Sequence, residues 1–182
     1  MKRFLAVVLG LFAIAGIARA DGGLGAMGSY WAPKGFQDNL GFGGKLTLGG
    51  TSFGLEVRGS YFENLKQKAE EGNLALQVIP FEAGLVLRAA GQQVTPYIGG
   101  GVGYYFLDGK SSDGLYSVDD EVGWYATGGL EIPLGKSTAL FGEALYRQVS
   151  GTAHSDSLNN LQGDVNIDLS GLVVNVGFLI KF

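Results

Sequence analysis

The last sixteen residues, Ile167–Phe182, constrain the fold of this chain more than any other stretch. Every second residue counted back from the C-terminus is large and apolar: Phe182, Ile180, Phe178, Val176, Val174 and Leu172. The residues between them include a lysine, an asparagine and two glycines, so the period of two predicts a strand with one apolar face. A long apolar strand at the edge of a soluble sheet promotes aggregation, whereas a closed barrel in lipid pairs its last strand with its first. This ending therefore predicts a transmembrane β-barrel.

The first twenty residues have the three parts of a secretory signal peptide. Lys2 and Arg3 supply the positive charge, Phe4–Ile17 supplies the apolar core, and Ala18-Arg19-Ala20 has the small-x-small form that signal peptidase requires. The apolar core is short for a membrane-spanning helix, which needs about 20 residues. We therefore predict a cleaved signal peptide over residues 1–20.

The mature chain, residues 21–182, has the length of one domain. Removing Lys2, Arg3 and Arg19 leaves ten basic and 17 acidic residues, a formal charge of −7, which argues against a nucleic acid partner. The sequence contains no cysteine, so the exported chain must be held together without disulfides, as the closed hydrogen-bond ladder of a barrel allows. No stretch of the mature chain suits a membrane helix and no cluster has metal-ligand spacing, so we predict no cofactor.

Eight segments of the mature chain alternate between apolar and mixed residues, as the strands of a barrel wall do. They predict an all-β fold, an eight-stranded antiparallel up-and-down transmembrane β-barrel. In the fourth segment the apolar residues change phase around Pro80, from Leu76 and Val78 to Phe81 and Ala83, which predicts a β-bulge at this proline. The predicted strands are Leu24–Trp31, Leu40–Leu48, Phe53–Phe62, Leu74–Arg88, Pro96–Leu107, Val122–Ile132, Ala139–Val149 and the C-terminal stretch.

The charged residues of the predicted strands share one face, opposite the apolar face. If these charges met lipid, the cost of roughly 2–4 kcal/mol for each Arg or Lys, and less for each acid, would exceed a typical folding stability of about 5–15 kcal/mol. We therefore predict that four acids and four bases face the lumen and form an internal ion network. These residues are Lys45, Glu56, Arg58, Glu82, Arg88, Glu131, Glu143 and Arg147.

A soluble, lipocalin-like barrel is the alternative, with apolar residues inside and the charges in water. The other face argues against it, because that face is wholly apolar and carries aromatic residues near strand ends, as the girdles of membrane barrels do. These aromatic residues are Tyr30, Tyr61, Tyr104, Phe106, Trp124 and Tyr146. The connections also alternate between short and long, as in outer-membrane barrels. We predict a multi-pass protein of the cell outer membrane with four extracellular loops and both termini in the periplasm.

The mature chain resembles the small outer-membrane β-barrel proteins of the OmpA-transmembrane-domain and OmpX type. The resemblance rests on Thr95–Tyr104, Pro80–Leu85 and Val176–Phe182. In that family the final aromatic residue belongs to a signal that the barrel assembly machinery reads during insertion. Phe182, together with the alternating Ile180, Phe178 and Val176, looks like that signal. Outer-membrane lipid and lipopolysaccharide are the other partners that we expect.

Enzymes also occur on eight-stranded outer-membrane barrels, among them lipid A deacylases and palmitoyl transferases. The deacylases carry His-x-Ser, followed by Asn, near the end of a late strand. The comparable place in this chain reads Gln148-Val149-Ser150-Gly151, so the general base is missing. The only histidine, His154, lies in a polar stretch with Ser155 and Asp156, and nearness in sequence does not supply the geometry of a triad. We predict that the chain is not an enzyme.

Two further features of the sequence bear on function. The glycine-rich run Gly99–Gly103 lacks the helix that follows a nucleotide-binding loop, and instead predicts close approach of strands and interior side chains. The acidic group Asp113, Asp119, Asp120 and Glu121 is either a solvated loop or a binding site for divalent cations that bridge lipopolysaccharide.

The width of an eight-stranded barrel favours one function over the others. Side chains just fill such a barrel, and balanced interior charges favour a plugged lumen. We therefore predict a structural or surface-interaction protein whose loops contact an extracellular ligand. A narrow ion channel through the lumen is the alternative, and a lipid A-modifying enzyme ranks third.

Overall fold

The computed structural model describes residues 22–50, 52–66, 75–89, 91, 93–110, 116–118, 120–155 and 165–182. The predicted signal peptide lies outside these residues. Within the described residues, no helix is long and apolar enough to span a bilayer. The strands are β1 (Gly22–Pro33), β2 (Asn39–Gly49), β3 (Phe53–Lys66), β4 (Ala75–Arg88), β5 (Thr95–Lys110), β6 (Tyr116–Val118), β7 (Glu121–Pro133), β8 (Thr138–Gln148), β9 (Ser150–Ser155), β10 (Val165–Asp168) and β11 (Gly171–Lys181).

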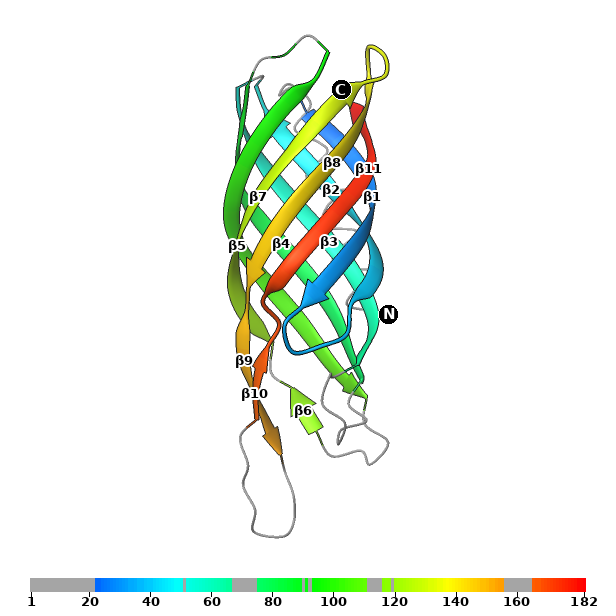
Figure 1. The fold of residues 1–182 in the computed structure, drawn as a ribbon. Coiled ribbons are helices and arrows are strands. Elements are labelled where there is room, and N and C mark those ends of the chain that lie inside the picture. The colour runs from blue at the N-terminus through cyan, green and yellow to red at the C-terminus, as the bar shows by residue number, and fades with distance from the viewer. Residues whose placement is uncertain are drawn as a thin grey trace.

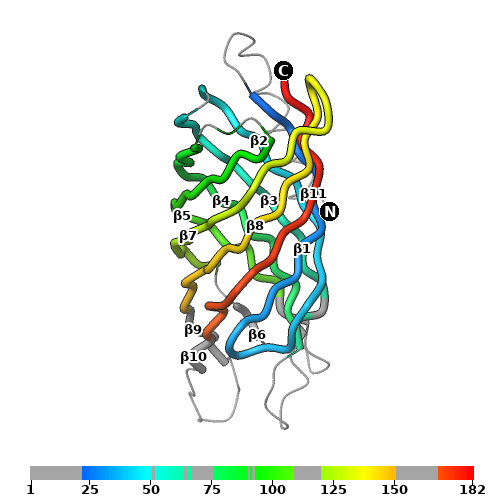
Figure 2. Tube along the Cα trace, turned by 45° about the horizontal axis from the view of Figure 1, so that its top comes forward, coloured from blue at the N-terminus to red at the C-terminus, as the bar shows by residue number. Residues whose placement is uncertain are grey.

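Eight of these strands close into an antiparallel barrel in the order β1-β11-β8-β7-β5-β4-β3-β2 (Figure 1 and Figure 2). The seam joins the first strand to the last, in a register that runs from Gly23 opposite Lys181 to Pro33 opposite Gly171. Gly22 and Phe182 exchange two backbone hydrogen bonds of 3.0 Å at one end of this seam. The closed eight-stranded barrel and the pairing of its terminal strands are therefore confirmed. We call the end that holds Gly22 and Phe182 the terminal end, and the opposite end the distal end.

The outer face of the barrel is apolar. Val122, Ile98 and Phe178 expose between 62% and 67% of their surface, whereas the interior Glu82 exposes none. Charges inside and large apolar side chains outside are the reverse of a soluble, lipocalin-like barrel. The inward placement of the charged face follows the expected cost of charge in lipid.

A second, small sheet continues the barrel beyond its distal end. It has the order β10-β9-β6, and Figure 1 shows it below the barrel, where β9 follows β8 and β10 leads into β11. The sequence predicted a loop over Ser150–Asn166, and that prediction is wrong for the described part. The predicted single strand at the C-terminus is also divided, because the chain leaves strand geometry at Leu169 and Ser170.

The break between the barrel and the distal sheet falls at the same level in two neighbouring places, between β8 and β9 and between β10 and β11. Leu169 donates from its backbone N–H to the Val149 carbonyl oxygen at 3.0 Å. The Ser170 hydroxyl accepts from the Val149 N–H at 3.0 Å and donates to the Val149 carbonyl oxygen at 3.2 Å. Val149 and Leu169 are both buried in the lumen at this level. The hydrogen-bond ladder between the two strands therefore continues through the Ser170 side chain, and the side chains of Val149 and Leu169 point into the lumen.

The predicted bulge at Pro80 is wrong. Strand β4 pairs with β5 in one register from Ala75 opposite Lys110 to Arg88 opposite Tyr97, without a shift at Pro80. The irregularity lies instead in β3, where the register against β4 shifts between Phe62 and Leu65. The apparent phase change has another cause: Leu76 and Val78 face inward, onto an apolar part of the lumen.

Candidate functional site

The lumen brings together six of the eight predicted charged residues. They form a compact group, which we call the ion layer, of three bases and three acids with zero formal charge. The members of the ion layer are Lys45, Glu56, Arg58, Glu82, Glu143 and Arg147. The other two predicted residues, Arg88 and Glu131, lie apart, at the terminal end, where Glu131 also pairs with Lys181. The sequence identified the inward face and could not divide it into these two groups.

Glu143 on β8 is the centre of the ion layer. Its Oε2 lies 3.1 Å from Lys45 Nζ and its Oε1 lies 2.9 Å from Arg58 Nη1, so it joins two cations from β2 and β3. Tyr97 donates its hydroxyl to Oε2 at 2.6 Å, and Asn175 donates its amide to Oε1 at 2.8 Å. Both carboxylate oxygens are therefore satisfied by partners from four other strands.

Glu56 supplies the second acid beside the same two cations. It lies 3.4 Å from Lys45 Nζ and pairs with Arg58 Nη2. Glu82 on β4 is the third acid, and it accepts from Arg147 Nε at 2.8 Å and from the Tyr105 hydroxyl at 2.8 Å. A longer contact of 3.9 Å between Glu82 and Arg58 Nε connects the two halves of the layer.

Aromatic rings cover the cations of the ion layer from both sides. Lys45 Nζ lies 3.8 Å from the ring centroid of Phe141, toward the terminal end. The Arg147 guanidinium carbon lies 5.0 Å from the Trp31 ring and 5.6 Å from the Phe62 ring, toward the distal end. Rings at these distances attract a desolvated cation electrostatically. Aromatic side chains therefore border the ion layer toward both ends of the barrel.

The distal half of the lumen holds a large apolar cluster. Its members, the distal cluster, are Trp31, Phe36, Phe62, Leu65, Leu76, Val78, Tyr105, Leu107, Tyr125, Leu145, Val149, Leu169 and Val173. A smaller cluster of Met27, Ala139, Phe141 and Leu179 lies toward the terminal end. Neither cluster was predicted from the sequence. The signal for the distal cluster was the set of apolar residues in the phase of the charged residues, such as Leu76 and Val78 in β4, Phe62 in β3 and Leu145 in β8.

Inward glycines make room for the long side chains of the lumen. A Cβ at Gly103 would lie 2.9 Å from Glu82 Cγ and 2.9 Å from the Tyr105 hydroxyl oxygen. A Cβ at Gly129 would lie 2.6 Å from the Tyr97 ring. These distances are shorter than side chains tolerate, so the glycines of β5 and β7 allow the tyrosines to reach the acids of the ion layer. The sequence predicted this role for the glycine run of β5.

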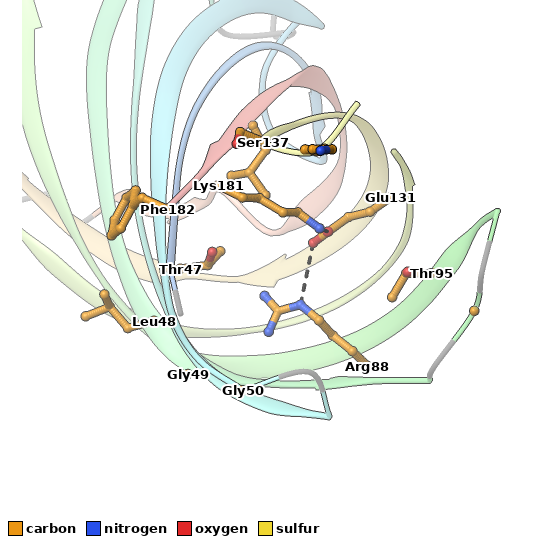
Figure 3. A pocket seen from close by; sticks show the side chains of 14 residues that line it. Thr47, Leu48, Gly49, Gly50, Arg88, Thr95, Glu131, Ser137, Lys181 and Phe182 are labelled. Carbon is orange, nitrogen blue, oxygen red and sulfur yellow. Dashed lines mark hydrogen bonds and ion pairs between the residues drawn. The ribbon is translucent and has the colours of Figure 1, made fainter. Parts of the chain in front are cut away.

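The terminal end opens into a cavity of about 500 Å³ (Figure 3). Glu131 lies in it between two cations, 3.5 Å from Arg88 Nε and 2.8 Å from Lys181 Nζ. Leu179, which belongs to the smaller apolar cluster, also lines this cavity. The cavity therefore borders the smaller apolar cluster through Leu179.

The residues of the predicted assembly signal all lie on the outer face of β11 or at its end. Val176, Phe178, Ile180 and Phe182 expose 56–62% of their surface. Their alternation with the buried Leu179 is that of a strand with one face toward lipid. The reading of this signal by the barrel assembly machinery stays a prediction.

The other candidates lie at the distal end. The backbone of His154 belongs to β9, opposite Ser117 of β6, and Asp156 lies outside the described residues. Of the acidic group, Asp113 and Asp119 lie outside the described residues as well. The Asp120 carboxylate accepts hydrogen bonds of 3.1 Å from the Leu107 N–H and from the Tyr104 hydroxyl. Across the described ranges, no three His, Asp or Glu side chains are grouped to hold a metal ion.

Comparison with known proteins agrees with this geometry. The family model of the outer membrane protein beta-barrel domain matches residues 4–182. A search of curated protein sequences gives no significant match.

Several solved structures have the same fold. Neisserial surface protein A superposes with a TM-score of 0.62, at 11% identity over 90% of this chain and 97% of that chain. Outer membrane protein W of E. coli gives a TM-score of 0.57, at 16% identity over 90% and 98% of the two chains. Outer membrane protein AlkL, studied in DMPC lipid bilayers, gives 0.58 at 15% identity, over 90% of each chain. At these identities the likeness concerns the fold.

Proposed function

The chain belongs to the outer membrane protein beta-barrel domain family, and from this premise we propose that it is a closed scaffold of the outer membrane with a structural or surface-interaction role. The observation that supports the proposal is the packing of side chains in the lumen, where rings of the distal cluster lie against Arg147 on one side of the ion layer and Phe141 lies against Lys45 on the other. A barrel filled in this way supports a rigid wall better than a path for ions. Function then resides in what the barrel displays.

The orientation of the barrel is the second part of the proposal. The termini would lie in the periplasm, and the distal sheet of β6, β9 and β10 would face the outside, in contact with lipopolysaccharide or an external ligand. The support is that the turns at the terminal end are short, with β2 and β3 only three residues apart, whereas the distal end carries the long connections and the additional sheet. Long loops on a rigid barrel are suited to surface contacts.

Single-channel conductance in a planar bilayer tests the closed lumen. We expect the refolded, inserted barrel to be silent, because aromatic side chains border the ion layer toward both ends of the barrel. Insertion is verified independently by the heat-dependent mobility of the folded barrel on a gel. Steady, ion-selective current steps that change in Glu143→Gln or Arg147→Gln, and not in Lys34→Gln outside the lumen, would instead establish the channel alternative.

Cysteine labelling tests the orientation, because the sequence contains no cysteine that would react in the background. Ser137→Cys places a single thiol in the exposed turn between β7 and β8, at the terminal end. Lys34→Cys places one at the exposed distal end. A membrane-impermeant maleimide should label only the Lys34→Cys variant on intact cells, and both variants after lysis. Labelling of Ser137→Cys on intact cells would reverse the proposed orientation.

A further inference from the structure

The cavity at the terminal end, which we call the vestibule, is lined by residues from several strands and turns (Figure 3). It occupies about 500 Å³ between the turns that follow β2, β4 and β7, and the ends of β11 and the chain. Its side chains include Thr47 and Leu179, which are 5% and 1% exposed and belong to the interior. The vestibule is therefore set into the barrel and is not a flat part of its rim.

The charges that line the vestibule are unbalanced. Arg88, Lys136 and Lys181 approach from three different parts of the wall, and Glu131 is the one acidic side chain among the lining residues. The excess of cations contrasts with the formal charge of −4 of the whole chain, and with the ion layer, where three bases meet three acids. The positive charge of the lining residues therefore attracts an anion to the vestibule.

Arg88 has unused donors that face this space. Its side chain is 11% exposed, and its contact with Glu131 is made by Nε at 3.5 Å, the long limit of a hydrogen bond. Within the described part of the chain, neither Nη atom donates a hydrogen bond, and Nη1 lies against Gly54, where an added Cβ would be 2.7 Å from it. Figure 3 shows them on the side of the guanidinium that is turned away from Glu131. A guanidinium with both Nη atoms available is suited to bind an oxyanion through two hydrogen bonds.

We propose that the vestibule binds a phosphate-class oxyanion on the Nη side of Arg88, beside the group that Arg88, Glu131 and Lys181 form. Arg88 would donate from its Nη atoms, Lys181 would supply a second charge, and the hydroxyl groups of Thr95 and Ser137 are further donors on the wall. Donors that converge from several directions match the tetrahedral oxygens of phosphate better than a planar carboxylate. The phosphate can belong to a small phosphate in solution or to the headgroup of a lipid at this end of the barrel. The proposal does not depend on the closed lumen.

Titration with inorganic phosphate tests the site, with NMR detection of the Arg88 side-chain Nε–H and of the Gly49 and Gly50 amides. The barrel is kept in a sugar-headed detergent, which carries no phosphate, and sodium chloride at equal ionic strength is the reference. We expect saturable shifts with phosphate, and roughly tenfold weaker binding in Arg88→Gln and in Lys181→Gln, because each removes a charge-assisted contact. Lys34→Gln, at the exposed distal end, is the matched control and should bind as the wild type does.

Nanodiscs distinguish the two sources of phosphate. If free phosphate fails to bind, the same nuclei are compared in nanodiscs of phosphatidylcholine and of phosphatidylglycerol. Shifts in either lipid relative to detergent, lost in Arg88→Gln and retained in Lys34→Gln, assign the site to lipid headgroups. The proposal is overturned if neither arm gives shifts, if chloride gives the same shifts as phosphate, or if Arg88→Gln binds as tightly as the wild type. The amide spectrum of each variant shows whether the barrel remains folded.

Discussion

The ion layer and the distal cluster occupy neighbouring parts of one lumen, and they are held by different interactions: ion pairs in the first and apolar packing in the second. In the ion layer, specific pairs such as Glu143 with Lys45 and Arg58 hold β8, β2 and β3 at fixed positions relative to one another. In the distal cluster, apolar side chains such as Phe62 and Trp31 pack against each other with ring centroids 5.0 Å apart, so their contact does not depend on pairing opposite charges. One layer therefore joins particular strands through charge pairs, whereas the other joins them through apolar packing.

The two layers should therefore respond differently to the loss of one side chain. A buried ion pair that loses a partner leaves an uncompensated charge, and the remaining strands cannot remove it by small movements. An apolar cluster that loses a few atoms leaves a cavity, which the neighbouring side chains can partly fill. Stability measurements on single variants test this difference directly.

Glu143→Gln should have the largest effect. It leaves Lys45 and Arg58 with only Glu56 and Glu82 nearby, so the ion layer carries a net positive charge. We expect the free energy of unfolding to fall by about 3–5 kcal/mol, as for other buried pairs that lose one partner. Urea unfolding in lipid vesicles, followed by tryptophan fluorescence, measures this loss.

The double variant Lys45→Gln/Glu143→Gln is the control for this interpretation. It restores zero formal charge to the ion layer, so we expect it to be more stable than Glu143→Gln alone. A double variant that is less stable than the single variant would show that packing, and not charge balance, sets the stability of the layer. The coupling between the two substitutions then reports the interaction itself.

The strands of the barrel wall could be predicted from the sequence, whereas the arrangement of the side chains in the lumen could not. Alternation with a period of two and the cost of charge in lipid placed Glu56, Arg58 and Glu143 inside. The partners of Glu143 depend on the stagger of strands that are up to 98 residues apart in the chain, which local pattern does not contain. Arg88 and Glu131 share the phase of the ion layer, and only their height along the barrel separates them from it.

The distal cluster and the distal sheet were missed for a related reason. Apolar residues that face the lumen, such as Leu76 and Val78, look the same in sequence as apolar residues that face lipid, so they suggested a phase change at Pro80 that does not exist. The stretch of β9 is polar and lacks alternation, and its strand geometry follows from continued pairing with β10. Pairing imposed by the barrel therefore overrides a weak local pattern.

Leu76→Ala should have the smaller effect, and it tests the distal cluster without changing any charge. Leu76 is fully buried, and its truncation leaves a cavity that the apolar neighbours partly fill. We expect a loss at the lower end of the usual range, about 2–3 kcal/mol in the same urea assay and below that of Glu143→Gln, with no current in the planar bilayer because an apolar cavity stays dry. Leu76→Met, which conserves volume, should cost less than about 1.5 kcal/mol. A larger loss in Leu76→Ala than in Glu143→Gln would reverse the roles assigned to the two layers.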